Sequence, residues 1–290
     1  MSSYLQLHRK HFDLQHFVTL ALKEDIQDGD HTALATLPKK RKGKMELKIK
    51  EDGVLAGVEA AKKIYAIIDP KISFKKIIND GESVKKGQIA FRVSGNTRTL
   101  LSTERLILNI MQRMSGIATK TKMLQNLCTG TSTRVIDTRK TTPNFRFFEK
   151  WAVVCGGGAN HRFGLYDMIL IKDNHIDFCG GITNAIDSVN KYLNKKNLKL
   201  KIEIEARSIA DVKEILKHGK VHRIMLDNFT PVQTKTAVQL INKRFETESS
   251  GGITEKNIRN YALCGVDFIS IGALTHHVKS LDLSLKTISR

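Results

Sequence analysis

The segment Leu200–Asp227, LKIEIEARSIADVKEILKHGKVHRIMLD, contains the local pattern that decides the fold. Apolar residues alternate with Glu over Leu200–Glu205, and His222–Asp227 is a second largely apolar run, so both segments are typical of strands. Between them, apolar residues recur at helical spacing over Ile209–Lys217, and Ser208 is placed to cap that helix. The segment predicts a β-α-β unit whose two strands belong to one parallel sheet.

Strands and helices continue to alternate on both sides of this unit. Further strands are expected at Arg134–Thr138, Met168–Lys172 and Phe268–Ile271, and further helices at Ile182–Leu193, Val232–Asn242 and Glu255–Leu263, the last of them capped by Thr254. Short connections between so many units favour a closed or nearly closed barrel of about seven strands. We therefore expect an α/β fold in which residues 116–290 form an incomplete, TIM-like barrel.

Residues 1–115 are predicted to form a smaller α+β domain. An amphipathic helix over residues 12–24 precedes the segment Lys44–Val93, where short strand-like runs are separated by Asp-Gly and Ser-Gly turns. One helix is expected within it, at Glu59–Ile68. A longer helix is then expected to begin with Ser102 as its N-cap, and the last helix of the chain is expected to pack back on this domain.

The composition indicates a globular protein with a strongly basic surface. Hydrophobic residues make up 41% and charged residues 27%, and 48 Lys and Arg against 29 Asp and Glu give a net charge of +19. This charge is compatible with nucleic acid, anionic lipid or a multiply anionic small molecule as the partner. Much of it lies in Lys39–Lys50 and Lys195–Lys201, which are better explained as solvated surface, because few aromatic residues lie nearby to stack on bases.

Cysteine spacing and hydropathy predict a cytoplasmic protein without a membrane span. Cys128, Cys155, Cys179 and Cys264 form no CxxC pair, so we expect free thiols rather than a disulfide framework or a zinc site. The N-terminal sequence MSSYLQLHRKHFDLQHF lacks the apolar core of a signal peptide. No apolar run approaches the roughly 18 residues that a membrane span needs.

Active sites of α/β barrels form at the carboxyl ends of the strands, and five successive predicted strands here end in charged residues or glycine. These residues are Asp137, Arg139 and Lys140; Lys172, Asp173 and Asn174; Glu203 and Glu205; Asp227 and Asn228; and Gly272. Glu203 and Glu205 face the same side of their strand, so with Asp227 they form a predicted carboxylate cluster. Such a cluster needs a cation, either Mg²⁺ or a salt bridge to Arg139 or Lys172, and the two solutions are compatible.

Cations are concentrated in the stretch Asp137–Ile176, DTRKTTPNFRFFEKWAVVCGGGANHRFGLYDMILIKDNHI. Together with the run Gly156–Gly158, they are Arg139, Lys140, Arg146, Lys150, His161, Arg162 and Lys172. They stand among Gly, Asn, His and apolar residues rather than Glu and Ser, which predicts a shaped site for anions. The loops Ser250–Gly252 and Gly272 predict a phosphate site. Arg105, in the expected first turn of its helix, is a weak further indication of a ligand, because the helix dipole disfavours a cation there.

Seven sequence blocks, spread over most of the chain, are characteristic: TERLILNIMQRMSGIATKT, DTRKTTPNFR, CGGGANHRFGLYDMILIKDNH, IEIEA, LDNF, SGGIT and ISIGALTHH. They resemble the quinolinate phosphoribosyltransferase family, also called nicotinate-nucleotide diphosphorylase (carboxylating). The resemblance implies a homodimer with a shared active site, in which each N-terminal domain helps to cover the barrel mouth of the partner. It also implies transfer of a phosphoribosyl group from phosphoribosyl pyrophosphate to the nitrogen of quinolinate, with loss of the 2-carboxylate as CO₂, to give nicotinate mononucleotide.

The resemblance, together with the glycine loops, suggests roles for individual residues. The quinolinate-binding residues would be Arg105 from the other subunit, Arg139, His161, Arg162 and Lys172. The residues binding phosphoribosyl pyrophosphate would be Lys140, Glu205, Asp227, Ser250, Gly251, Gly252 and Gly272, and the catalytic set would be Lys140, Lys172, Glu205 and Asp227. The expected cofactor is Mg²⁺, held by Glu205 and Asp227 directly or through water, with Glu203 as a further ligand. No general base is required, in agreement with the absence of a His–carboxylate pair from these motifs.

The sequence departs from the family pattern at two positions, and three alternative functions remain. Asn144 and Trp151 stand where Gly and Tyr are common, and both are expected to be loop or packing variants. The alternatives are a nicotinate-using relative, another phosphosugar-binding barrel enzyme, and a basic nucleic-acid-binding protein. Retention of Arg105, Arg139 and Arg162 argues against a nicotinate-using enzyme, which needs one carboxylate partner fewer. We expect no nucleic-acid or membrane partner.

Overall fold

The computed structural model describes residues 12–288, and they divide into two compact units. The barrel unit comprises Met123–Lys140 and Gly158–His276. The N-terminal unit comprises the described residues up to Lys122, the segment Thr141–Gly157 and the residues from His277 onward. This division differs from the single boundary expected between residues 115 and 116. Residues 1–11, which carry much of the expectation about a leader sequence, lie outside the described residues.

The barrel unit contains a parallel sheet of six strands among its described residues, in the order β6-β11-β10-β9-β8-β7. The strands are β6 (Arg134–Ile136), β7 (Ile169–Ile171), β8 (Ile202–Ala206), β9 (Arg223–Asp227), β10 (Glu246–Ser250) and β11 (Phe268–Ser270). β6 and β7 are the two edges of the sheet, so the barrel is incomplete, as expected. The number is six rather than about seven, and β10 is a strand that the polar sequence ETESS did not predict.

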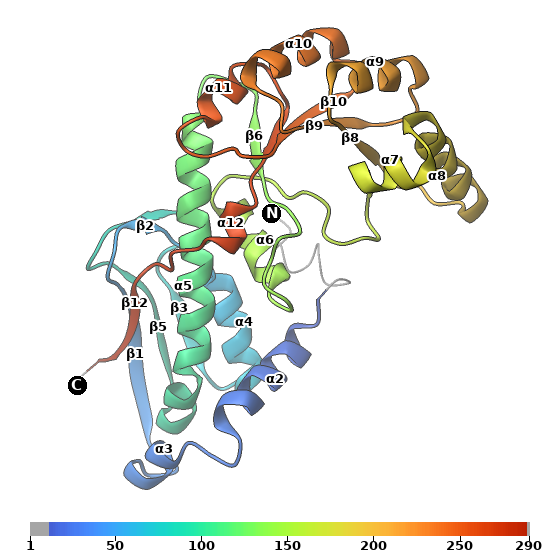
Figure 1. The fold of residues 1–290 in the computed structure, drawn as a ribbon. Coiled ribbons are helices and arrows are strands. Elements are labelled where there is room, and N and C mark those ends of the chain that lie inside the picture. Colours follow the sequence, from blue (N-terminus) through green and yellow to red (C-terminus); the bar gives the residue numbers. More distant parts are fainter. Residues whose placement is uncertain (1–11, 289–290) are drawn as a thin grey trace. The chain divides into compact units, whose positions relative to one another are not determined.

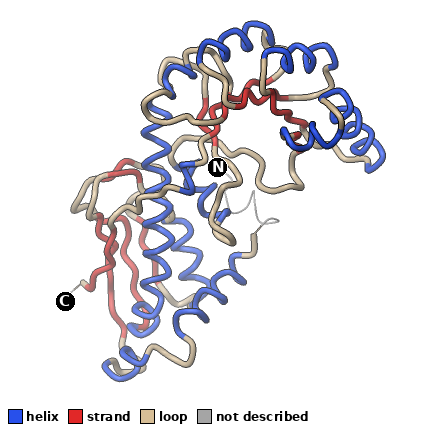
Figure 2. The backbone as a smooth tube through the Cα atoms, viewed as in Figure 1, coloured by secondary structure: helices blue, strands red, loops and turns tan. Residues whose placement is uncertain are grey.

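Helices lie along one face of this curved sheet (Figures 1 and 2). They are α7 (Asp173–Cys179), α8 (Ile182–Lys196), α9 (Ile209–His218), α10 (Pro231–Ile241) and α11 (Ile258–Ala262), while the short helix α12 (Ala273–His276) follows β11. Ser208 caps α9 as predicted, and its hydroxyl accepts from the N–H of Asp211. Thr254 does not cap α11, because a turn intervenes and Asn257 takes the N-cap position.

Strand alternation separates two kinds of side chain in this sheet. Along β8, Ile202 and Ile204 alternate with Glu203 and Glu205, and all four are buried. The register places Arg223 of β9 beside Glu203, so the face that carries the two glutamates is charged at this level as well. The polar face of the sheet therefore belongs to the barrel interior, where it leads to the strand ends.

The N-terminal unit is built on a four-stranded antiparallel sheet in the order β12-β1-β5-β3. The strands are β1 (Lys42–Ile49), β3 (Ser73–Lys76), β5 (Ile89–Asn96) and β12 (Leu283–Thr287), with a separate pair β2 (Gly53–Val54) and β4 (Ser83–Val84). The element that packs back on this domain was expected to be the last helix, but among the described residues it is the strand β12. Leu283 and Leu285 are buried on alternate positions, and Leu285 pairs with Leu47 of β1.

The helices of this unit are α2 (Leu14–Ile26), α3 (His31–Thr36), α4 (Val58–Ile68), α6 (Arg146–Cys155) and the long α5 (Thr97–Leu127), whose residues beyond Lys122 belong to the barrel unit. Ser102 is not the N-cap of α5, because the Asn96 side chain accepts from the N–H groups of Arg98 and Thr99. Arg105 therefore lies more than two turns into the helix, and the dipole argument for a ligand there is wrong.

Helix α6 changes the interpretation of the cation-rich stretch. Phe145, Phe147, Phe148 and Trp151 form an aromatic cluster with Phe12 and Phe17, which places this segment in the N-terminal unit. Lys150 is fully buried there, and the guanidinium of Arg146 donates to Thr141 Oγ1 at 2.9 Å. A Cβ on Gly156 would lie 2.4 Å from the carbonyl oxygen of Ala118, so this glycine permits close packing on α5. Arg146 and Lys150 are not part of the pocket described below.

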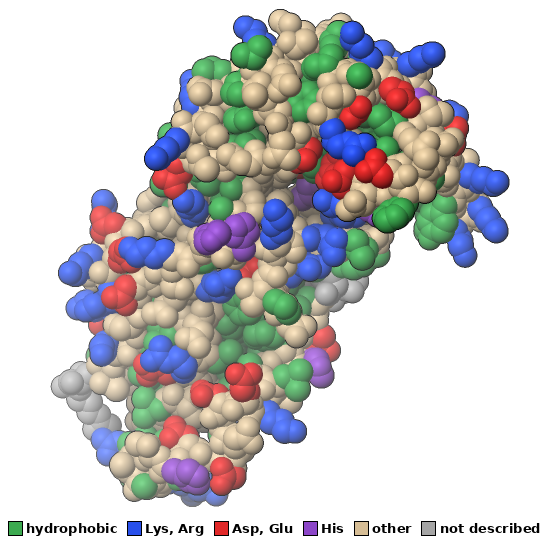
Figure 3. Space-filling model, viewed as in Figure 1, with side chains coloured by type: hydrophobic (Ala, Val, Ile, Leu, Met, Phe, Trp, Pro, Cys, Tyr) green, Lys and Arg blue, Asp and Glu red, His purple; other side chains and the backbone are tan. Residues whose placement is uncertain are grey.

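Lys and Arg side chains are scattered over the face that Figure 3 shows, among Asp and Glu side chains, rather than gathered in one patch. Among residues 12–288, no helix is both long and apolar enough to cross a membrane.

Candidate active site

A cavity of about 730 Å³ opens at the carboxyl ends of the barrel strands. Its charged lining residues are Arg139, Lys140, His161, Arg162, Lys172, Glu205, Asp227, Glu248 and His276, and its loop residues include Ser250, Gly251, Gly252 and Gly272. Nearly all of the residues to which the resemblance and the glycine loops gave a role in binding or catalysis therefore lie in one pocket. The exceptions are Arg105, an exposed residue of α5 in the N-terminal unit, and Glu203, which lies deeper in the barrel.

The cationic side of the pocket is formed by the segments that follow β6 and precede β7. Burial and the neighbouring charge of Arg139 lower the pKa of the Arg162 guanidinium, so the two arginines lie close enough to repel each other. The Arg162 side chain donates to the carbonyl oxygen of Met168 at 3.3 Å. An anion between these guanidiniums would relieve their repulsion, and paired arginines match the geometry of a carboxylate.

Asp137 holds this side of the pocket in place from below. It is fully buried, and its two carboxylate oxygens accept from the backbone N–H of His161 at 3.0 Å and from the Asn160 amide at 2.6 Å. Asp137 does not line the cavity. Its position at a strand end therefore serves to orient the segment that carries Arg162.

The acidic side of the pocket begins at Glu205 on β8. Its carboxylate accepts from Lys172 Nζ at 2.9 Å and from the backbone N–H of Asp173 at 3.0 Å, so the expected salt bridge to Lys172 is present. Burial, and then the negative charge of Glu205, raise the pKa of the Asp227 carboxyl. A divalent cation beside Asp227 and Glu205 would favour the ionised form of Asp227, and such cations prefer oxygen ligands.

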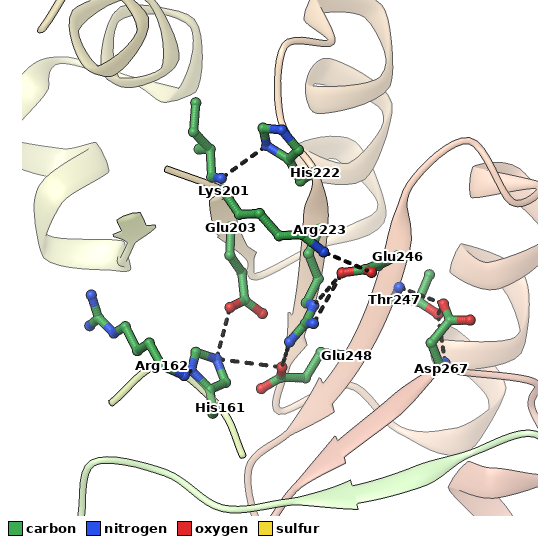
Figure 4. Close-up of polar contacts among 11 residues, drawn as sticks. His161, Arg162, Lys201, Glu203, His222, Arg223, Glu246, Thr247, Glu248 and Asp267 are labelled. Atoms are coloured by element: carbon green, nitrogen blue, oxygen red, sulfur yellow. Dashed lines mark hydrogen bonds and ion pairs between the residues drawn. The ribbon is translucent and has the colours of Figure 1, made fainter. Parts of the chain in front are cut away.

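Glu203 lies elsewhere, although it shares a strand face with Glu205. It is fully buried, and its carboxylate lies 2.8 Å from His161 Nε2, which also lies 3.5 Å from Glu248 (Figure 4). Burial raises the pKa of Glu203 to about 7, and burial together with the charge of Glu203 raises the pKa of Glu248 to about 8. The structure thus contains a buried His–carboxylate contact that the sequence motifs did not indicate.

His161, Glu203 and Glu248 offer metal-ligating atoms within 4.8 Å of one another. Arg223 Nη1 already donates to Glu248 at 2.9 Å, however, so a guanidinium supplies positive charge to this cluster. Sequence reasoning missed both Glu248 and Arg223. Strand alternation could have indicated Arg223, which lies four residues before Asp227 and therefore on the same strand face. It was weak for Glu248, because its strand was not predicted.

The loops after β9, β10 and β11 form the remaining wall. Gly251 and Gly252 have φ of +92° and +61°, and a Cβ on Gly251 would lie 2.1 Å from Asn228 Oδ1. The backbone N–H of Asn228 donates to the carbonyl oxygen of Ser250 at 2.9 Å, which ties the first two loops together. A Cβ on Gly272 would lie 2.9 Å from the Lys140 side chain. Glycine thus lets the backbone approach the pocket closely, as a phosphate-binding loop requires.

Comparisons with known proteins point to one family over most of the chain. The family model described as "Quinolinate phosphoribosyl transferase, N-terminal domain" matches residues 30–115, and that for the C-terminal domain matches residues 117–286. The chain is 45% identical to the nicotinate-nucleotide pyrophosphorylase [carboxylating], chloroplastic, of Arabidopsis thaliana, over 95% of this chain and 83% of the relative. It is 37% identical to the probable nicotinate-nucleotide pyrophosphorylase [carboxylating] of Bacillus subtilis, over 95% of this chain and 93% of the relative.

Solved structures give the same result. The nicotinate-nucleotide pyrophosphorylase from Francisella tularensis superimposes with a TM-score of 0.88 at 36% identity, covering 95% of this chain and 96% of that one. A human nicotinic acid phosphoribosyltransferase has a TM-score of 0.55 at 10% identity, covering 96% of this chain and 74% of that one, which shows a likeness of fold alone.

Proposed function

Because the chain belongs to the quinolinate phosphoribosyltransferase family, we infer that its pocket transfers a phosphoribosyl group from phosphoribosyl pyrophosphate to quinolinate. Loss of the 2-carboxylate as CO₂ completes the reaction, which yields nicotinate mononucleotide for pyridine nucleotide biosynthesis. The observation that carries this assignment is the division of one pocket into a cationic side, suited to a dicarboxylate, and a side of carboxylates and glycine loops, suited to a phosphorylated sugar.

The cationic side is the proposed quinolinate site. Arg139 and Arg162 bind the two carboxylates and orient the pyridine ring, since guanidinium groups can form two parallel hydrogen bonds to one carboxylate. Lys172, which is held by Glu205, contributes a further positive charge at the junction of the two sides. Lys140 lies against the Gly272 loop, where it can contact the pyrophosphate as well.

The acidic side is the proposed site of the ribose and the pyrophosphate. The ribosyl carbon gains positive charge as its bond to pyrophosphate breaks, and the carboxylates of Glu205 and Asp227 stabilise that charge. Lys140 and Lys172 stabilise the negative charge of the departing pyrophosphate. Decarboxylation leaves an electron pair on the ring carbon beside the cationic pyridinium nitrogen, and that carbon then takes a proton from water, so no protein base is needed for this step.

Mg²⁺ is the proposed cofactor, and the residues of the acidic side fit it. Glu205 and Asp227 would hold it directly or through water, because both line the pocket and a cation there would offset the burial and the charge of Glu205 that raise the pKa of Asp227. When bound, Mg²⁺ would neutralise pyrophosphate oxygens. Glu203 is no longer a candidate ligand beside these two, because its carboxylate is directed to His161.

Substitution of Arg139 tests the quinolinate site. Arg139→Ala removes one carboxylate partner, and we expect nicotinate mononucleotide formation to fall by at least about a hundredfold, with Arg139→Lys recovering only part of it. Arg244→Ala is a matched control, because this arginine is exposed and donates to the carbonyl oxygen of Leu216 outside the pocket. Unchanged kinetics of Arg139→Ala would remove this residue from the site.

We further propose a homodimer in which Arg105 of one subunit completes the quinolinate site of the other. Arg105 is exposed on α5 and does not line the pocket of its own barrel unit. Mixing Arg105→Ala with the barrel variant Lys172→Ala should restore about a quarter to a half of the activity, through hybrid dimers with one intact site. Two inactive variants that stay inactive when mixed would exclude a shared site.

The cytoplasm remains the proposed compartment, although plant relatives carry chloroplastic or mitochondrial names. Imaging of the fluorescently tagged full-length protein in its own cells would decide this point.

A further inference from the structure

A chain of alternating basic and acidic side chains runs beneath the pocket (Figure 4). Arg223 Nη1 donates to Glu248 at 2.9 Å, and Glu248 lies 3.5 Å from His161 Nε2. On its other side Arg223 donates to Glu246 at 3.0 Å, and Lys201 contacts Glu246 at 3.3 Å near the surface. The described residues therefore connect the floor of the pocket to the amino-terminal ends of the strands.

This arrangement is costly for a barrel interior. Glu248 is fully buried, and the Arg223 side chain is only 11% exposed, with its guanidinium 4.0 Å from the centre of the Phe268 ring. Replacing a buried ion pair by apolar residues of similar volume is often neutral or stabilising, so such a pair is a poor device for stability alone. A geometric role explains its presence better.

This row of charged side chains ends at His161, and the orientation of its imidazole matters for binding. His161 Nε2 lies 2.8 Å from Glu203, and its Nδ1 accepts from the backbone N–H of Arg162 at 2.7 Å. The imidazole is thus fixed between two buried carboxylates and the backbone of Arg162. Since the Arg162 side chain lines the cavity, any rotation of the imidazole would disturb the cationic side of the pocket.

We propose that Arg223 is a positioning residue for quinolinate binding, although it does not line the pocket. Its planar guanidinium holds Glu248 and Glu246 at the same time, Glu248 restrains His161, and His161 restrains the backbone of Arg162. An ammonium group cannot reproduce this arrangement, because a point charge does not fix two carboxylates in one plane. The inference rests on the proposed function, because it assigns Arg223 to the quinolinate half of that reaction.

Arg223→Lys tests the proposal, because it keeps the charge and changes only the geometry. We expect the KM for quinolinate to rise about tenfold, as expected when a buried acceptor loses a well-placed donor. The KM for phosphoribosyl pyrophosphate and kcat should stay within about twofold. A merely structural role would instead lower the active fraction or raise both KM values together, and either result would overturn the proposal.

Two further variants keep the test decisive. Ser249→Ala is the matched control, because Ser249 is buried on the same strand as Glu248 but on the opposite face, and it should leave both KM values unchanged. If Arg223→Lys does not fold, Glu246→Gln weakens the outer partner of Arg223 at a position that is 37% exposed. Glu246→Gln should raise the KM for quinolinate about threefold, and no change in a folded protein would overturn the proposal. Failure of the wild-type enzyme to convert quinolinate would instead refute the proposed function.

Discussion

Gly251 provides a quantitative test of the proposed phosphate loop. Its φ of +92° is strained for any residue with a side chain, and a Cβ there would lie 2.1 Å from Oδ1 and 3.0 Å from the backbone nitrogen of Asn228. Asn228 cannot retreat freely, because its own φ is +55° and its N–H is bonded to Ser250. Gly251→Ala therefore has to displace the loop after β9 relative to the loop after β10, which are held together by the Asn228–Ser250 hydrogen bond.

The expected magnitude follows from two contributions. A left-handed backbone costs a residue with a side chain about 1–2 kcal/mol, and forcing the Asn228 side chain off its rotamer costs about 0.5–1.5 kcal/mol more. A total of about 1.5–3.5 kcal/mol corresponds to a factor of roughly 10–300 in an equilibrium constant. If recovering the phosphate-binding geometry costs all of this, the KM for phosphoribosyl pyrophosphate rises by about tenfold to a few hundredfold.

The assay is steady-state formation of nicotinate mononucleotide, with each substrate varied in turn. The KM for quinolinate should change by less than about threefold, because its proposed ligands lie in the segments that follow β6 and flank β7, away from the Gly251 loop. Gly265→Ala is the control: φ is +86° there, but a Cβ would meet only Val238 at 3.8 Å, and Gly265 does not line the pocket. It should lower the thermal stability without changing either KM. An unchanged KM for phosphoribosyl pyrophosphate in Gly251→Ala would refute the reasoning.

Three other predictions concern charge. Burial raises the pKa values of Glu203 and Glu248 to about 7 and about 8, so the folded protein retains protons that the unfolded chain releases above about pH 4.5. As the pH rises from about 5 to about 8, the free energy of unfolding should therefore fall. Urea titrations should show a smaller decrease for Glu248→Gln than for the wild type, and equal decreases in the two proteins would contradict this. Asp227→Asn should raise the Mg²⁺ concentration for half-maximal activity at least about tenfold, with a KM for quinolinate within about twofold; a requirement equal to that of the wild type would exclude Asp227 as a ligand. Because the cations on the face that Figure 3 shows are dispersed, retention on heparin should be lost near 0.15 M salt, and retention well above about 0.3 M would favour a dedicated polyanion site.

The helices and strands that were predicted well from the sequence are those with a regular apolar pattern of their own. β8, α9 and β9 agree with expectation to within about two residues, because each alternates or repeats apolar positions over its whole length. β10 was not predictable in this way. Its inward residue Glu248 is stabilised by Arg223 from β9, and Thr247 on the other face bonds to Asp267, so its strand character depends on neighbours distant in the sequence.

Much of the pocket was also predictable from the sequence, because it is built from residues at strand ends. Residues at strand ends converge in any parallel barrel, so Arg139, Lys172, Glu205 and Asp227 were identifiable from their positions alone. Glu203 lies two residues before the strand-end residue Glu205 on β8, and so deeper in the barrel. Two residues along a strand span about 6.6 Å, so Glu205 reaches the rim while Glu203 remains in the buried interior beside His161. Arg146 and Lys150 were misplaced because their cation-rich stretch contains α6, whose aromatic residues anchor it in the N-terminal unit.

The central claim is that one pocket binds a pyridine dicarboxylate and a phosphorylated ribose and couples their joining to decarboxylation. The most direct test is release of ¹⁴CO₂ from quinolinate labelled in its 2-carboxylate, measured together with nicotinate mononucleotide. We predict one CO₂ for each nucleotide formed, with both products dependent on phosphoribosyl pyrophosphate. Turnover of nicotinate in place of quinolinate, without release of CO₂, would contradict the claim.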